Sequence, residues 1–148
     1  MACVIRKVIA YVTRKNQGIP QLLVFEHVDV DAGVQVPKGT VEPGEAVERA
    51  MRREVYEESG LTRLAALEFI GAITQTAFGD AEEWNFFAVV LDQVAPDTWI
   101  HRVEGKGEDE GIRFRYYWTP LNPEPNLAGR QGDGLPLLKK YVSELDRW

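Results

Sequence analysis

The stretch that decides the fold of this chain is Gly39-Thr-Val-Glu-Pro-Gly-Glu-Ala-Val-Glu-Arg-Ala-Met-Arg-Arg-Glu-Val-Tyr-Glu-Glu-Ser-Gly-Leu61. Pro43-Gly44 interrupts any regular structure before it, and Glu45 places a negative charge in the first turn of a helix, where the helix dipole favours it. The segment therefore predicts a helix over residues 45–59. Gly60 then supplies a stop at the C-terminal end of this helix.

The predicted helix carries two different faces. Residues three and four apart lie on the same side, so Glu54, Glu57 and Glu58 project together. Their charges repel one another unless a cation lies among them, and carboxylate oxygens suit Mg²⁺ or Mn²⁺ better than zinc, which prefers histidine and cysteine. A second stripe is apolar and is expected to pack against the core, namely Val47, Ala50, Met51 and Val55.

A glutamate-rich helix also has a simpler interpretation, a solvated face on which glutamates pair with arginines. Arg53 and Glu57 stand four residues apart and suit such a pair. The glycines at both ends of the segment, together with the spacing of its charged residues, favour a functional site over a solvated face.

Written by spacing, the segment is G-x5-E-x7-R-E-V-x-E-E-x-G-L, which resembles the complete signature of the Nudix hydrolases. The resemblance implies an α/β fold, a Nudix-type α/β/α sandwich with a central mixed sheet. It also implies an enzyme that uses Mg²⁺ or Mn²⁺ to hydrolyse a nucleoside diphosphate linked to another moiety. By position, the family's catalytic and metal-binding glutamates match Glu54, Glu57 and Glu58. The metal-binding carbonyl matches Gly39, and the arginine that orients a glutamate matches Arg53.

The residue that accepts the proton of the attacking water differs among members of the family. Some use a glutamate of the signature, and others use one from a loop further along the chain. Here that loop is 102–111, and our hypothesis is that Glu104, Glu108 or Glu110 completes the metal site. The alternative is a flexible acidic loop with no part in the reaction.

Two residues outside the helix bear on the substrate. Lys38, between Pro37 and Gly39, is expected to contact phosphate oxygens as a point charge. Phe78 occupies the neighbourhood where diadenosine polyphosphate hydrolases often have a tyrosine, so it is a candidate for stacking on a base, with a core position as the alternative. The resemblance therefore favours a dinucleoside polyphosphate or a related nucleotide as substrate.

Two other functions stay open at this point. One is pyrophosphohydrolysis of nucleoside di- or triphosphates, or of RNA 5′ ends. The other is a Nudix-fold binding module that has lost catalysis, which the intact Glu54, Glu57 and Glu58 disfavour.

Patterning of the remaining chain predicts a mixed α/β order. Strands are expected at residues 4–13, 21–26, 67–76, 84–91 and 112–119, and a closing helix at residues 135–145. The segment 120–134 is expected to be a loop. Lys7, on the first strand, is a candidate for reaching phosphate, although a strand-surface charge is the more common role. His101, near the acidic loop, is a candidate for contacting the leaving group, although a lone loop histidine is more often solvated.

Length and charge bound the remaining possibilities. The chain has 148 residues, which predicts a single domain over residues 1–148. Its net charge of −6 disfavours a broad nucleic-acid-binding surface, although RNA 5′ ends stay compatible. The single cysteine, Cys3, predicts no internal disulfide, and no signal-like or membrane-length apolar run is present, so a cytoplasmic location is predicted. Many family members are dimers, so a homodimer is compatible with the resemblance.

Overall fold

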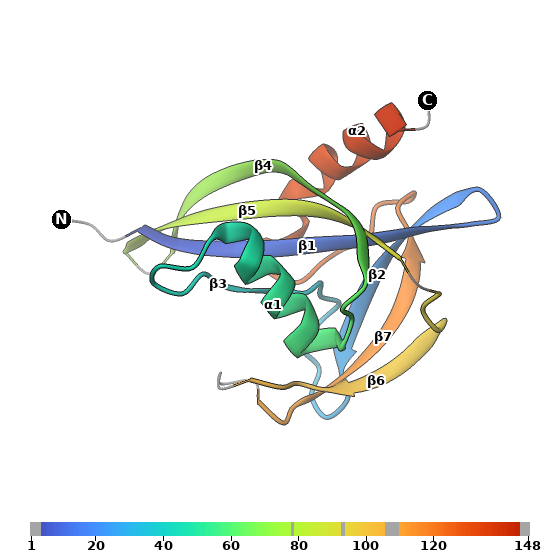
Figure 1. Ribbon diagram of the computed structural model, residues 1–148, viewed down its shortest axis with the longest axis horizontal. Coiled ribbons are helices and arrows are strands. Elements are labelled where there is room, and N and C mark those ends of the chain that lie inside the picture. Colours follow the sequence, from blue (N-terminus) through green and yellow to red (C-terminus); the bar gives the residue numbers. More distant parts are fainter. Residues whose placement is uncertain (1–3, 78, 93, 106–109, 146–148) are drawn as a thin grey trace.

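A computed structural model describes residues 4–77, 79–92, 94–105 and 110–145 (Figure 1). The elements in chain order are β1 (Val4–Asn16), β2 (Ile19–His27), β3 (Lys38–Thr40), α1 (Val47–Ser59), β4 (Leu64–Ala77), β5 (Asp80–Leu91), β6 (Thr98–Arg102), β7 (Arg113–Pro120), the short 3₁₀ helix η1 (Gln131–Gly134) and α2 (Leu135–Leu145). None of the helices among these residues is long and apolar enough to cross a membrane.

The strands form one mixed sheet in the order β4-β5-β1-β2-β7-β6, with β3 also paired to β1. β1 and β5 run parallel, and the other paired strands run antiparallel. One edge of β1 has two partners: Lys7 to Ile9 pair with β3, and Thr13 to Asn16 pair with β2. This division of β1 brings the start of the signature segment beside Lys7.

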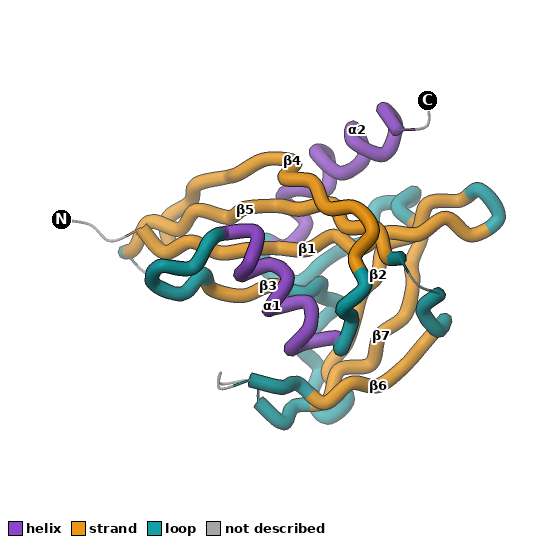
Figure 2. The backbone as a smooth tube through the Cα atoms, viewed as in Figure 1, coloured by secondary structure: helices purple, strands orange, loops and turns teal. Residues whose placement is uncertain are grey.

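Each face of the sheet is covered by one helix, and Figure 2 shows α1 crossing in front of the strands while α2 begins behind β4 and β5. Side chains alternate between the two faces along a strand. On β1, Val8 and Val12 therefore pack with α1, and Ile9 and Tyr11 pack with α2. The predicted sandwich with a central mixed sheet is confirmed.

Local chemistry explains where the observed elements differ from the predicted ones. The β1–β2 hairpin extends to Asn16 and Ile19, because Gln17 and Gly18 both have positive φ angles, 52° and 78°, and so allow a two-residue turn. The helix α1 begins at Val47 rather than at residue 45, because the backbone of the N-cap residue Ala46 is extended, with φ −70° and ψ 145°.

Three short elements were absent from the prediction. The strand β3 has three residues and β6 has five, so neither is long enough for its own sequence to show an alternating pattern. Each depends on a long-range partner, β1 for β3 and β7 for β6. The segment 120–134, expected to be a loop throughout, ends in η1.

Candidate active site

The glutamates of α1 line a cavity of about 730 Å³ between the helix, β3 and the segment after β6. We call it the carboxylate cleft. It is lined by Lys7, Lys38, Gly39, Thr40, Val41, Glu42, Pro43, Arg53, Glu54, Glu57, Glu58, Val103, Glu104 and Glu110. The structure therefore brings Glu54, Glu57 and Glu58 together with Lys38 and Gly39, as the sequence predicted. It adds part of a loop that lies about fifty residues further along the chain.

Arg53 binds several groups at the inner wall of the cleft. Its Nε and one terminal nitrogen donate to both oxygens of Glu45, at 2.8 and 2.9 Å. The other terminal nitrogen donates to Glu54 at 2.7 Å and to Glu57 at 3.4 Å. The two-pronged bond from Arg53 lowers the pKa of Glu45 to about 2, and hydrogen bonds to Glu45 and Glu54 raise the pKa of Arg53. The pair of Arg53 with Glu57 four residues on is present, within a network of three carboxylates.

Glu54 is held against the backbone of β3. A Cβ atom on Gly39 would overlap the Glu54 carboxyl group, so a glycine at position 39 is what permits this approach. Burial raises the pKa of Glu54, and the charge of Glu57 raises it further, whereas the hydrogen bond from Arg53 lowers it. A partly buried carboxylate beside two others is a group that a cation would stabilise.

Glu58 is the most enclosed of the three glutamates, with 5% of its surface exposed. Its Oε2 accepts a hydrogen bond from the backbone N–H of Lys38 at 3.3 Å. The glutamate face of the helix is therefore not a uniformly solvated face, because one of its three carboxylates is buried.

The oxygen donors of the cleft suit Mg²⁺ or Mn²⁺ in kind but are not gathered around one point. Among the described residues, no three aspartate, glutamate, histidine or cysteine side chains stand close enough together to hold a metal ion as they are placed. Glu54 and Glu57 each give an oxygen to Arg53 instead. Their donor chemistry, carboxylate and carbonyl oxygen throughout, fits these hard cations, and rotation of flexible glutamate side chains is what a metal site here requires.

Two lysines of the sheet are among the residues that line the cleft. Lys38 lies on β3, with its Nζ 5.7 Å from the centre of the Trp84 ring. Lys7, for which the sequence left phosphate contact and a surface charge as alternatives, is among the residues that line the cleft, and its Nζ donates to the Thr40 hydroxyl at 2.7 Å. Only the pairing of β1 with β3 places Lys7 here, so no pattern within β1 could have revealed it.

The later acidic loop reaches the same cleft. Glu104 and Glu110 both line it, and the backbone N–H of Glu104 donates to the Glu57 carbonyl at 2.9 Å. A Cβ atom on Gly105 would lie 2.8 Å from the carboxyl carbon of Glu57, so the loop packs directly on the helix. Glu108, the third candidate of this loop, and Phe78, the candidate for base stacking, lie outside the described residues.

His101 is not the solvated loop residue that the sequence suggested. It lies on β6, half-buried, with Nε2 3.1 Å from the carbonyl oxygen of Glu57. The expectation was wrong because β6 itself was not recognised.

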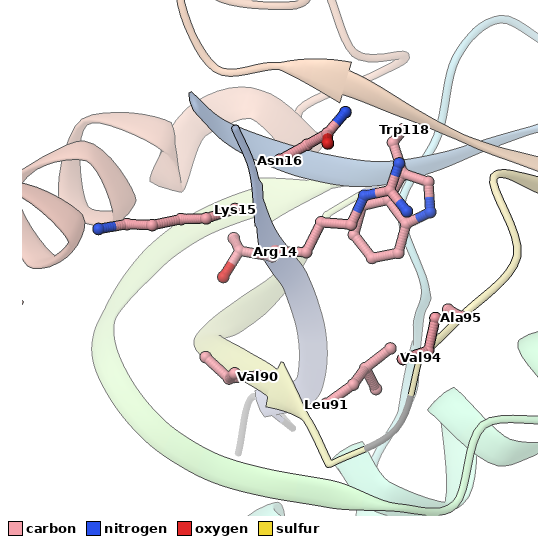
Figure 3. Close-up of a pocket in the computed structure, with 9 residues that line it drawn as sticks. Arg14, Lys15, Asn16, Val90, Leu91, Val94, Ala95 and Trp118 are labelled. Carbon is pink, nitrogen blue, oxygen red and sulfur yellow. The ribbon is translucent and has the colours of Figure 1, made fainter. Parts of the chain in front are cut away.

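A second hollow of about 370 Å³ lies at the far end of β1 (Figure 3). We call it the strand-end hollow; its lining is Thr13, Arg14, Lys15, Asn16, Val90, Leu91, Val94, Ala95 and Trp118. The Arg14 guanidinium lies over the Trp118 ring at 4.4 Å and donates to Asp97 and Gln21. Its charge is therefore already matched within the fold.

The family model described as NUDIX domain matches residues 5–138 of the chain. This chain belongs to the NUDIX family. It is a Nudix hydrolase, and α1 with its flanking glycines is the helix of the Nudix signature.

Three comparisons place this Nudix hydrolase among known proteins. An RNA pyrophosphohydrolase of Rhodopseudomonas palustris (strain BisA53) is 28% identical over 134 residues, which cover 80% of this chain and 70% of the relative. A C. elegans Ap4A hydrolase, in a binary complex, has a TM-score of 0.69 at 18% identity, over 95% of this chain and 98% of that one. The NUDIX domain of Shewanella oneidensis NrtR, complexed with ADP ribose, has a TM-score of 0.71 at 11% identity, over 96% and 90% of the two chains. The two structural matches establish the fold.

Proposed function

We propose that this protein uses Mg²⁺ or Mn²⁺ to hydrolyse a phosphoanhydride bond in a dinucleoside polyphosphate or a related nucleotide. The observation that carries the proposal is the composition of the carboxylate cleft. It joins the glutamates of α1 to Lys7, Lys38 and the acidic loop after β6 in one cavity. Carboxylates suited to a divalent cation, beside lysines suited to phosphate, form a combination adapted to a polyphosphate chain.

The charged residues of α1 and β3, with Lys7, have distinct roles in this proposal. Glu54, Glu57, Glu58 and the Gly39 carbonyl would hold the metal, which when bound neutralises phosphate oxygens and lowers the pKa of a water. Lys38 and Lys7 would bind the phosphate oxygens that extend beyond the metal. Arg53, which donates to Glu54 and Glu57, would keep these carboxylates oriented.

A carboxylate must also accept the proton of the attacking water. The candidates in the cleft are a glutamate of α1 and the two loop residues Glu104 and Glu110. The packing of Gly105 on Glu57 supports a part for the loop, because it brings the backbone beside Glu104 against a residue proposed to hold the metal. Lys38 keeps its proposed substrate role, and Phe78 stays a sequence-based proposal.

A second candidate substrate is the 5′ end of RNA. The curated relatives at 26 and 28% identity are named RNA pyrophosphohydrolases, which favours it. The net charge of −6 counts against long contacts with an RNA backbone. RNA would then be engaged through its terminal phosphates, the same chemical group that a dinucleoside polyphosphate presents.

A substrate panel tests the proposal. Release of phosphate and nucleotide is measured from dinucleoside polyphosphates, ADP-ribose, NADH, nucleoside di- and triphosphates and 5′-triphosphorylated RNA. Each is tested with Mg²⁺, with Mn²⁺ and with a chelator. We expect metal-dependent cleavage that is fastest with a dinucleoside polyphosphate. Faster cleavage of the RNA would establish the second candidate, and no cleavage by folded, metal-loaded protein would support the binding-module alternative.

A further inference from the structure

The last turn of α1 carries both Glu57 and Glu58, and side chains of β6 and β7 bind the backbone of this turn. The final carbonyl groups of a helix have no partners within the helix, so something else must satisfy them. In α1 no basic residue lies in the last turn, although the N–H of the C-cap residue Gly60 donates to Tyr56. The next carbonyls along, those of Glu57, Glu58 and Ser59, therefore need donors from elsewhere.

Three aromatic side chains supply these donors, one to each carbonyl. The Tyr116 hydroxyl donates to the Glu58 carbonyl at 2.9 Å, and this bond is buried. The Trp99 indole N–H donates to the Ser59 carbonyl at 3.1 Å. His101 Nε2 lies 3.1 Å from the Glu57 carbonyl oxygen, and because a carbonyl can only accept, this nitrogen carries the proton.

The three donors are themselves fixed by the sheet. Trp99 and Tyr116 are directly paired across β6 and β7, and their rings stack with centroids 4.9 Å apart. Trp99 and His101 are two residues apart on β6, so both project from one face of the strand. Gly60 leaves room for the imidazole, since a Cβ at that position would lie 3.1 Å from two atoms of the His101 ring.

We propose that Trp99, His101 and Tyr116 are positioning residues, which fix the last turn of α1 so that the Glu57 and Glu58 carboxylates face the carboxylate cleft. None of the three lines the cleft, and each acts on the backbone of the residue rather than on its side chain. A rigid turn matters here because ligand groups must be held close to their working geometry for metal binding and catalysis.

The same strands also deliver the acidic loop. The residues after β6 continue to Glu104, whose N–H shares the Glu57 carbonyl with His101. One backbone atom of α1 therefore contacts both β6 and the loop that follows it. The distance between the helix glutamates and Glu104 is set by this shared contact.

Tyr116→Phe is the decisive variant, because it removes one hydroxyl and keeps the stacked ring. Tyr117→Phe is its matched control on the next residue of β7, where the hydroxyl donates to Glu26 at 2.8 Å and the side chain packs on the α2 side of the sheet. Unfolding in urea, Mn²⁺ binding, kcat and KM are measured for both variants. We expect Tyr116→Phe to weaken Mn²⁺ binding and lower kcat, each about tenfold, with KM changed less than about twofold.

A merely structural role for the hydroxyl would give a different result. Tyr117→Phe is expected to lose some stability without changing Mn²⁺ affinity or kcat. If Tyr116→Phe behaved in the same way, the positioning role would be overturned. A second comparison uses His101→Gln, which keeps an N–H donor, and His101→Leu, which does not. Recovery of kcat in the glutamine variant supports the proposal, and equal losses in both contradict it.

This inference rests on the proposed metal-dependent hydrolysis, so its failure must be separable from the failure of that function. A wild-type protein that binds no Mn²⁺ and cleaves nothing would refute the function alone. Hydrogen exchange of the backbone amides in the last turn of α1 then reads the positioning directly, in metal-free protein. Faster exchange in Tyr116→Phe than in Tyr117→Phe would uphold it, and equal exchange would overturn it.

Discussion

The carboxylate cleft and the strand-end hollow each contain an arginine bound to a carboxylate, yet their charges differ. In the hollow, Arg14 is matched by Asp97, by the Gln21 amide and by the face of Trp118. The cleft lining has six glutamates, residues 42, 54, 57, 58, 104 and 110, against three cationic side chains, Lys7, Lys38 and Arg53. A fold that leaves carboxylates in excess at one place, one of them with its pKa raised, marks that place for a ligand, whereas the Arg14 charge in the hollow is already matched within the fold.

Glu57→Gln is the change expected to have the largest effect. It keeps the shape of the side chain and removes a charge from the proposed metal site. We expect turnover to fall by about 10²–10⁴-fold with the fold retained, since metal ligands and proton acceptors contribute effects of this size. Turnover is measured with saturating Mg²⁺ and circular dichroism checks the fold. Unchanged turnover would refute the proposed role of Glu57.

Gly39→Ala tests the contact between β3 and the helix. The new methyl group would displace the Glu54 carboxyl group, which can rotate away, so we expect kcat to fall about 10–100-fold with a much smaller loss of stability. Gly132→Ala is the matched control, because its new Cβ would meet Leu135 at an ordinary 3.5 Å. Equal kcat in the two variants would show that this position of Glu54 is not used.

The loss of stability at acid pH reports on the ion pair between Glu45 and Arg53. The pKa of Glu45 is lowered from 4.5 to about 2 by Arg53, so the ionised form is favoured in the folded state. Its contribution is therefore present above pH 4.5 and lost as the pH falls toward 2. We expect Glu45→Gln to remove on the order of 1 kcal/mol of this pH dependence, since a partly solvated pair is screened.

Urea unfolding between pH 2 and pH 6, in the absence of metal, measures this effect. The contribution of Glu54 to stability has the opposite dependence on pH. Burial raises its pKa in the folded protein, so stability falls as the pH rises from the ordinary pKa of a glutamate through the raised one. The difference between wild type and Glu45→Gln isolates the Arg53 pair from Glu54. Parallel pH profiles for the two proteins would contradict the assigned shift.

Arg14→Gln, in the strand-end hollow, is expected to have the smallest effect. It removes the contact with the Trp118 ring and an ion pair to Asp97, whose side chain is 90% exposed. We expect a loss of about 0.5–1 kcal/mol in the free energy of unfolding and no change in turnover. A loss of turnover would show that the two ends of the molecule are coupled, and would weaken the contrast between them.

The sequence predicted the part of the site that lies on one continuous helix. Glu54, Glu57 and Glu58 share a face because helical spacing alone requires it, and the cleft contains all three. Lys7 could not be assigned in this way, since its place depends on the three-residue pairing of β1 with β3. The donors Trp99 and Tyr116 were also missed, because a bond to a backbone carbonyl imposes no pattern on the residue that receives it.

The sheet order has a consequence for how the chain is made. β1 pairs with β5, and β2 pairs with β7, so these two strand pairings join residues far apart in the sequence. Such contacts form slowly, and during synthesis an early strand must wait for a late one. The helix with its crowded glutamates leaves the ribosome well before β6 and β7, which later bind its last turn. The acidic helix is thus synthesised before the strands that order its final turn.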